Sequence, residues 1–317
     1  MANDIDSRHG SLPEHAIYSK FPATIDEQLS ILAARGMIID DLPSAKRFLS
    51  ENYFHRFLSY SVPFFRSVSA NVSKFYLDGV KFSDVINIYE FDSKLRLLLL
   101  DAIEKIEISI KTQFINLSAK YGAHFYLSHK LFRDHKLLND SIERLQYQMR
   151  ASNDLLVNEY FAKYDNPNLP PVWVAMELLS IGQMAKWLLN LKRDEDRQTV
   201  ARHYHLHYSI LRAVIDNLTL IRNYSAHHAR IWNRHYDFAE CVCDSNNELI
   251  KDTLCISDGR IYRVLILIAY ILRCIGGDKE FVMNLFDIIH KYQIDVKQMG
   301  FPDGWQAKFH GILDLAI

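Results

Sequence analysis

The stretch LRLLLLDAIEKIEISIKTQFINLSAKYG, residues 95–122, decides the fold class of this chain. Apolar residues recur in it every three or four positions and charged residues fill the opposite face, which is the pattern of an amphipathic helix. We expect one long helix that begins near Ser83 and ends at Gly122. Its apolar stripe comprises residues 95, 98, 99, 102, 103, 106, 110, 114 and 117.

Shorter helical patterns lie on both sides of this stretch. TIDEQLSILAARG, residues 24–36, predicts a helix in which Thr24 is the N-cap, Glu27 completes a capping box and Gly36 stops the helix. The aromatic segment 53–76 is interrupted at Pro63, and we expect it to be irregular. Further helices are expected at about 43–52, 140–164, 173–191, 206–229, 259–275 and 278–297, followed by a short last helix.

The chain as a whole is predicted to be all-α. Only 11 Gly and 8 Pro interrupt its 317 residues, and no segment has a strong strand pattern. DNPNLPP, residues 165–171, is the clearest break, and we place it inside one domain. We expect residues 1–17 to be a disordered leader and residues 18–317 to form a single helical domain.

The composition limits the classes of function. A net charge of −1 excludes a general binder of polyanions, so a site for nucleic acid needs a local concentration of positive charge. Four cysteines do not make a disulfide scaffold, and Cys241-x-Cys243 alone is poor evidence for zinc. The longest apolar run, residues 264–272, is about half a bilayer span. We therefore expect a cytoplasmic protein without a membrane segment.

One segment concentrates positive charge and histidine. Residues 201–235 read ARHYHLHYSILRAVIDNLTLIRNYSAHHARIWNRH, with five arginines and six histidines against one acid, Asp216. A solvated helix face usually mixes Lys with Glu and contains little His, so this composition suits a phosphate-rich partner better. The buried stripe expected for this helix comprises Leu211, Val214, Ile215, Leu218 and Ile221.

Arg222 is predicted at the edge of that stripe rather than opposite it. A guanidinium there needs a carboxylate, such as that of Glu104 or Glu107, or a water-filled cleft. On a straight helix, at about 100° per residue, neither His227 nor His228 lies above Arg222. The helix therefore bends or ends near Ser225, or a second copy completes the site.

The string Arg222-Asn223-x-x-Ala226-His227-His228, followed by Arg230, Trp232, Asn233 and Arg234, resembles the signature of the Abi (abortive infection, AbiD/AbiF-like) bacteriophage-resistance proteins. These proteins belong to the wider HEPN superfamily, whose RNases carry an Arg followed by four to six residues and a His. Flanking segments resemble the same family in the same order. These are TIDEQLSILAARGMIIDD, ENYFHRFLSYSVPF, FDSKLRLLLLDAIEKIEISIKTQF and LPPVWVAMELLSIGQMAKWLLNLK.

The resemblance implies a HEPN-like helical bundle with extra N-terminal and C-terminal helices, and a metal-independent endoribonuclease of phage defence. Such an enzyme cleaves RNA by 2′-hydroxyl attack and leaves a 2′,3′-cyclic phosphate, using histidine for proton transfer and arginine for the phosphate. It needs no cofactor, forms a homodimer with a composite site, and is held silent by an RNA or protein antitoxin. The catalytic residues carried over are Arg222, His227, His228 and Asn223, with His227 favoured over His228 for proton transfer. The residues expected to contact RNA are Arg230, Asn233, Arg234, Arg212 and His203, whereas Trp232 is expected in the core.

Two other functions remain open at the level of the sequence. The first is a module on the same fold that binds RNA or a protein partner without cleaving. The second is a metal phosphohydrolase, because His203, His205 and His207 alternate and would share one face of a strand. The helical flanks of this triplet and the absence of a nearby carboxylate cluster disfavour the metal site.

Overall fold

The computed structural model describes residues 22–66, 75–238, 248–254, 258–277 and 279–315. Within these ranges the named elements are all helices, and β-structure is limited to isolated bridges such as Ile38 with Lys81. The prediction of an all-α chain is therefore confirmed. The chain divides into two compact units at Val85 and Ile86. The single domain expected over residues 18–317 stays a prediction, and the expected leader and three of the cysteines, Cys241, Cys243 and Cys255, lie outside the described residues.

The first unit begins with the capped helix that the sequence predicts. Helix α1 (Ile25–Ala34) starts at Thr24, whose hydroxyl accepts the Glu27 N–H at 3.3 Å. The Glu27 carboxylate in turn accepts the Thr24 N–H at 2.7 Å, which completes the capping box. The chain turns at Gly36 with φ +91°, and helix α2 (Leu42–Glu51) follows close to its predicted bounds.

The segment expected to be irregular contains a helix, so that expectation was wrong. Helix α3 (Phe54–Ser61) forms because Phe57, Tyr60 and Ser61 provide one buried face. Pro63 does not interrupt this helix, because it falls in the following 3₁₀ turn, η1 (Val62–Phe64), where its missing N–H costs nothing. The Phe57 ring stacks on Phe82 with centroids 4.4 Å apart.

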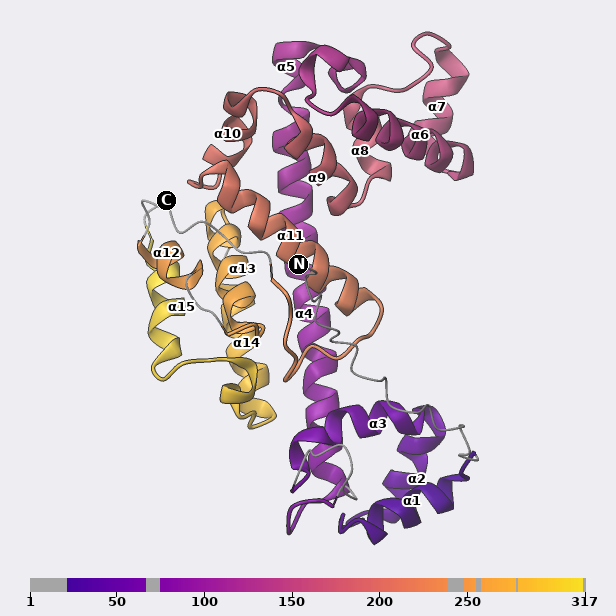
Figure 1. Ribbon diagram of the computed structural model, residues 1–317, viewed down its shortest axis with the longest axis vertical. Helices are drawn as coiled ribbons and strands as arrows, with labels where there is room; N and C mark the ends of the chain where they lie inside the picture. Colours follow the sequence, from indigo (N-terminus) through magenta and orange to yellow (C-terminus); the bar gives the residue numbers. More distant parts are fainter. Residues whose placement is uncertain (1–21, 67–74, 239–247, 255–257, 278, 316–317) are drawn as a thin grey trace, which may run out of the picture. The chain divides into compact units, whose positions relative to one another are not determined.

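The long helix is confirmed, with one difference at its end. Helix α4 (Phe82–Ile115) buries the predicted stripe up to residue 114 except residue 98, which is half-buried, and Leu117 is buried just after the helix ends. It stops at Ile115 rather than Gly122, and a separate turn of helix, α5 (Ser118–Tyr121), reaches Gly122 at φ +89°. From Ile86 onward α4 belongs to the second unit, in which Figure 1 shows it as the longest helix.

Two regions predicted as single helices are each divided in two. The first consists of α6 (His135–Ala151) and α7 (Leu155–Lys163), because the Asp154 carboxylate caps α7 by accepting the Leu156 N–H at 2.9 Å. The second consists of α8 (Val172–Leu178) and α9 (Ile181–Asn190), because Ser180 and Gln183 form a capping box that starts a new helix. Side chains that bind backbone N–H groups locally end one helix and begin the next.

The remaining helices complete the second unit (Figure 1). Those near the predicted positions are α11 (Tyr208–Ala226), α13 (Tyr262–Cys274), α14 (Glu280–Lys291) and α15 (Trp305–Leu313). Those that were not predicted are α10 (Asp194–Arg202), α12 (Glu248–Leu254) and the 3₁₀ turns η2 (Phe125–Leu127), η3 (His129–Leu131) and η4 (Val296–Met299).

Helix α11 is held in the middle of this unit by α9, α10 and α13. Its five predicted stripe residues, from Leu211 to Ile221, are each no more than 1% exposed. The approach to α9 is close at Gly182, where an added Cβ would lie 3.1 Å from the Thr219 methyl group. A glycine inside α9 therefore has a packing reason, because it lets the two helix backbones come together.

Candidate active site

Helix α11 ends where the two histidines of the basic segment begin. Its last residue is Ala226, and His227 is its C-cap with φ −91° and ψ 16°. Of the arrangements that the sequence left open, an end of the helix near Ser225 is the one observed. Because the chain leaves the helix here, the directions of His227 and the residues after it no longer follow the 100° rule for a straight helix.

The turn after α11 is a Schellman motif. His228 donates its N–H to the Ser225 carbonyl at 3.1 Å, and Ala229 donates to the Tyr224 carbonyl at 2.8 Å. His228 itself adopts the left-handed conformation, with φ +57°. Glycine or asparagine usually occupies this position, because a side chain there costs roughly 1–2 kcal/mol. His205 after α10 and Gln293 after α14 adopt the same conformation, so it places the imidazole of His228 without by itself indicating a function.

The motif side chains differ in exposure along this end of α11. Arg222 is half-buried, whereas Asn223, His227 and His228 are exposed. Within the described ranges Arg222 forms no ion pair, and Glu107, one of the two carboxylates considered for it, pairs instead with Lys111 at 2.9 Å. A half-buried guanidinium without a carboxylate is therefore available to an external anion.

A buried ion pair on α4 holds the chain just after the histidines. Asp92 is fully buried and pairs with Arg96 one turn later. The same carboxylate accepts the backbone N–H of Ile231 at 3.1 Å and that of Trp232 at 2.7 Å. The Tyr236 hydroxyl donates to the Ile231 carbonyl at 3.1 Å, and burial raises the pKa of this tyrosine well above its usual value. Residues 227–230 are therefore fixed at both ends, by α11 and by Asp92.

Sequence reasoning missed Asp92 and Arg96. The signal that could have revealed them is an Asp and an Arg four residues apart, with Asp92 next to Phe91 and Arg96 next to Leu95, both at 0% exposure in the core. Charged residues at such positions are rarely fully buried unless they are paired. The backbone groups that Asp92 binds lie 139 and 140 residues further along the chain, so no local pattern indicates them.

The other motif residues pack around this anchor. Trp232 is 3% exposed, so its predicted place in the core is confirmed. Arg234 is half-buried, lies with its guanidinium carbon 4.1 Å from the centroid of the Tyr224 ring and donates to the Tyr224 hydroxyl at 3.0 Å. Arg230 and Asn233 are also half-buried, and Asn233 has φ +46°.

The comparisons with known proteins bear on this segment. A family model described as Abi-like protein matches residues 47–233, more than half of the chain. The chain belongs to the Abi-like protein family. The match runs from α2 through α4 to Asn233, so it includes Arg222, both histidines and Asp92. No curated protein and no solved structure matches the chain.

Membership of the Abi-like family implies a role in abortive infection, a form of defence against phage. Helix α1 and helices α12 to α15 lie outside the matched residues, so the match does not reach TIDEQLSILAARGMIIDD, one of the flanking segments that resemble the family. The extra N-terminal and C-terminal helices of a HEPN-like bundle stay a prediction. None of the helices in the described ranges has the length and apolar character needed to cross a membrane.

Two of the residues predicted to contact RNA lie away from the Abi-like motif. Arg212 is exposed near the start of α11 and lies 3.8 Å from Asp216. It is ten residues before Arg222, or about 15 Å along the helix. His203 is the C-cap of α10, before α11 begins, and it is exposed. The structure therefore does not bring these two residues to the end of α11, and a role for them in binding RNA stays a prediction.

The three alternating histidines of this Abi-like chain do not share a strand face. His203 ends α10, His205 lies in the turn with φ +52°, and His207 is the N-cap of α11, where its ring accepts the Ser209 N–H at 3.4 Å. The described part of the chain contains no group of three His, Cys, Asp or Glu side chains that could hold a metal ion. The metal-phosphohydrolase hypothesis required the three histidines to lie on one face of a strand, and they do not.

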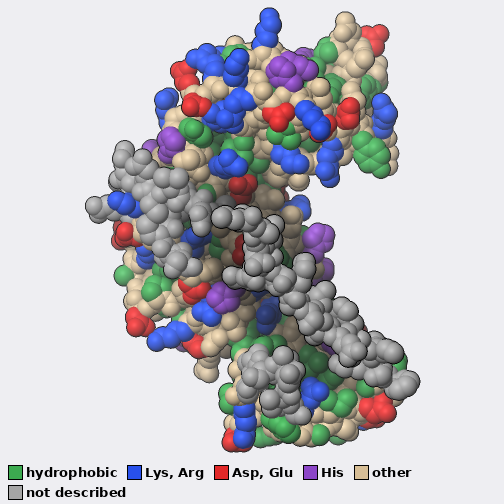
Figure 2. Space-filling model, in the orientation of Figure 1, with side chains coloured by type: hydrophobic (Ala, Val, Ile, Leu, Met, Phe, Trp, Pro, Cys, Tyr) green, Lys and Arg blue, Asp and Glu red, His purple; other side chains and the backbone are tan. Residues whose placement is uncertain are grey.

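A cavity of about 470 Å³ adjoins the motif and opens between α6, α9 and α11. Asn223 lines it together with Arg144, Gln148, Gln183 and Lys186. Basic and acidic side chains are mixed elsewhere on the face that Figure 2 shows, so the described residues of that face form no uniformly basic area. One motif residue, Asn223, and two cations from other helices therefore meet at this cavity.

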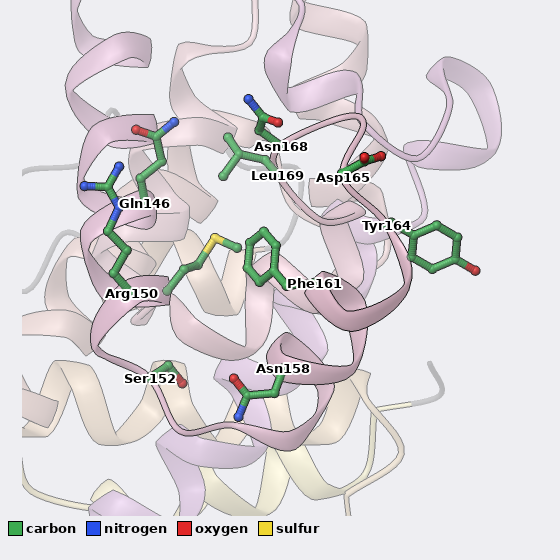
Figure 3. Close-up of a pocket in the computed structure, with 10 residues that line it drawn as sticks. Gln146, Arg150, Ser152, Asn158, Phe161, Tyr164, Asp165, Asn168 and Leu169 are labelled. Carbon is green, nitrogen blue, oxygen red and sulfur yellow. The ribbon is translucent and has the colours of Figure 1, made fainter.

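A larger cavity of about 670 Å³ lies on the other side of α6 and contains no motif residue. Figure 3 shows Phe161 of α7 facing Gln146 and Arg150 of α6 across it, while Tyr164 points away. Size alone would make it the first candidate for a ligand site. Its separation from the Arg222–Arg234 segment makes it a comparison site for the experiments below.

Proposed function

We propose that the chain is a metal-independent endoribonuclease of the HEPN type that acts as the toxin in abortive infection. The observation that carries this proposal is the end of α11, where the half-buried Arg222 has no carboxylate partner among the described residues and two exposed histidines follow it. Membership of the Abi-like family supports the setting of phage defence.

The chemistry needs only groups that this segment carries. The 2′-hydroxyl of RNA lies beside the scissile phosphate and attacks phosphorus once a base removes its proton. A bond forms between phosphorus and the 2′-oxygen, the bond to the 5′-oxygen breaks, and an acid protonates that leaving oxygen. The products are a 2′,3′-cyclic phosphate and a 5′-hydroxyl. Proton transfer of this kind contributes about 10²- to 10⁴-fold to the rate.

His227 is assigned as the principal proton-transfer residue, with His228 as the second. Arg222 would bind the phosphate oxygens with its planar guanidinium and stabilise the charge that develops in the transition state. Asn223, exposed beside it, would orient the phosphate or a histidine. Arg230 and Asn233 are assigned to flanking RNA, and the stacking of Arg234 on Tyr224 would hold its charge in place for the same purpose.

The site is proposed to be composite, built where two copies of the chain meet. The resemblance to HEPN proteins, in which such sites form where two protomers meet, supports this part of the proposal. A two-fold axis through this surface would place Arg222 of one protomer opposite His227 of its partner. An RNA or protein antitoxin that covers the site would keep it silent in uninfected cells.

The test is incubation of the purified protein with RNA in EDTA. The proposal expects cleavage by the wild-type chain and a loss of at least about 100-fold in the Arg222→Ala and His227→Ala variants. His55→Ala is the matched control, because His55 is exposed and lies in the first unit. Binding of RNA without cleavage would instead support the non-catalytic module, and activity that EDTA abolishes would contradict the metal-independent mechanism.

A further inference from the structure

The cavity of about 470 Å³ beside the motif combines features of three helices. Helix α11 contributes Asn223 and Thr219, α9 contributes Lys186 and Gln183, and α6 contributes Arg144. Gly182 of α9 lines it beside Thr219, and these two helices are closely packed, because a Cβ added at Gly182 would lie 3.1 Å from the Thr219 methyl group. We call this cavity the α6–α9–α11 groove.

The two cations of the groove have no anionic partner among the described residues. Arg144 and Lys186 are both exposed, and neither forms an ion pair within the ranges that the structure describes. The one acid among the lining residues, Asp216, lies 3.8 Å from Arg212, which partly neutralises it. Two unpaired cations beside one paired acid give the groove an excess of positive charge in a chain whose net charge is −1.

The same two cations extend the groove beyond the first cavity. Arg144 and Lys186 also line an adjoining cavity of about 140 Å³, which includes Ser141 and Trp187. That second cavity adds one acid, Asp140, so the two cavities together have two cations and two acids, and the positive excess belongs to the first cavity. The groove therefore extends from Asn223 past both cations, along α6 and α9. A single nucleic-acid strand that enters or leaves the motif would follow such a path.

Neutral polar groups line the groove between its two ends. Gln183 donates its side-chain amide to Gln148 at 3.1 Å, across the gap from α9 to α6. Its oxygen is held by the Ser180 N–H at 2.9 Å, as part of the capping box of α9. The two amides are therefore positioned before any ligand binds, and they offer donors and acceptors suited to ribose hydroxyls and base edges.

We propose that the α6–α9–α11 groove binds the sugar–phosphate backbone of one RNA strand and leads it to the end of α11. Arg144 and Lys186 each contact one phosphate, and Asn223 lies at the junction with the cleavage site. A cavity of this size is comparable to pockets for single small ligands, so it holds a nucleotide or two of one strand rather than a duplex. This inference rests on the proposed ribonuclease function for the identity of the ligand.

The test measures the binding of a fluorescently labelled single-stranded RNA by anisotropy over a series of salt concentrations. It uses the His227→Ala background so that the RNA stays intact. Each phosphate contact with a single strand contributes about 0.7 to the slope of log K against log salt. Arg144→Ala and Lys186→Ala should each reduce the slope by about that amount and weaken binding several-fold, equally for different RNA sequences.

Arg150→Ala is the matched control. Arg150 lies on the same helix as Arg144 and is also exposed, but it lines the other cavity (Figure 3). It should leave the salt dependence unchanged. The inference is overturned when Arg150→Ala weakens binding as much as Arg144→Ala, or when neither Arg144→Ala nor Lys186→Ala changes the slope while both variants melt at the wild-type temperature.

Steady-state kinetics with the intact catalytic motif separates this inference from the proposed function. Arg144→Ala and Lys186→Ala should raise KM several-fold and leave kcat within about twofold, because they bind flanking phosphates rather than the reacting one. A protein that binds RNA through the groove but never cleaves it would refute the ribonuclease and retain the groove. If the protein cleaves RNA and the KM of both variants equals that of the wild type, the ribonuclease is retained and the groove is refuted.

Discussion

Trp232 donates its backbone N–H to the Asp92 carboxylate at 2.7 Å, which joins the segment after α11 to a helix 140 residues earlier in the chain. Asp92 also binds Ile231 and Arg96, and all of these groups are buried. The two histidines of the motif lie in the Schellman turn that ends α11, just before this anchor. The hydrogen bonds to Asp92 therefore hold the backbone after the two histidines against the buried core.

Replacing Asp92 should be strongly destabilising. Asp92→Ala removes the buried partner of Arg96 and the acceptor of two backbone N–H groups, which should lower the free energy of unfolding by about 3–5 kcal/mol. Asp101→Ala is the matched control, because Asp101 pairs with Lys105 on the same helix at 2.9 Å but on the surface. That pair should contribute at most about 1 kcal/mol. Urea denaturation measures both, and equal effects would show that Asp92 does not act as an anchor.

His228→Gly should stabilise the fold while it removes an imidazole from the site. Glycine adopts φ +57° without strain, so the variant should gain about 1 kcal/mol, whereas His228→Ala should gain nothing. Thermal melting measures this difference. When both variants cleave RNA at the wild-type rate, His228 has no part in proton transfer and His227 acts without it.

A mixture of two inactive variants should recover activity when the site is composite. In a heterodimer of Arg222→Ala with His227→Ala, one of the two sites contains both wild-type side chains and the other contains neither. Random exchange of subunits makes half of the dimers mixed, so the mixture should reach about a quarter of the wild-type rate. No recovery after refolding the two chains together, with heterodimers present, would place Arg222 and His227 of the same protomer in one site.

Cys274 should react slowly with alkylating reagents in the folded protein. Burial raises the pKa of its thiol from 9.0 to about 11, so only about one thiol in a thousand is ionised at pH 8. The thiolate is the reactive form, and the rate should therefore rise roughly tenfold per pH unit up to about pH 11. Mass spectrometry of the Cys274 peptide after iodoacetamide treatment, in buffer and in urea, measures the protection. Equal rates of alkylation at pH 8 in buffer and in urea would contradict the raised pKa of the Cys274 thiol.

The features predicted correctly from the sequence are those set by local chemistry. The stripe of α4 and the Thr24–Glu27 capping box follow from residues spaced within one turn of each other. The end of α11 near Ser225 was one of the alternatives that the sequence left open. The divisions at Asp154 and Ser180 were missed, although both are helix-capping residue types, because the apolar pattern continues across them. Local caps outweighed periodicity at both places.

The parts of the site that were missed depend on contacts between distant segments. Asp92 is recognisable as an anchor only when α4 is placed against residues 231 and 232. Arg144 and Lys186 belong to the groove only because α6 and α9 pack beside Asn223. Conversely, Arg212 and His203 are close to the motif in sequence but lie toward the other end of α11. Closeness in sequence therefore wrongly suggested that Arg212 and His203 lie beside the motif. It gave no indication of Arg144 and Lys186, which are distant in sequence.

The central claim is that the chain cuts RNA with the 2′-hydroxyl of its substrate and without a metal ion. The most direct measurement incubates the wild-type protein in EDTA with an RNA and with the same sequence carrying 2′-O-methyl groups, and identifies the product ends by mass spectrometry. The account predicts that only the unmodified RNA is cut, and that its fragments end in a 2′,3′-cyclic phosphate and begin with a 5′-hydroxyl. Cleavage of the methylated strand, or fragments that begin with a 5′-phosphate, would contradict it.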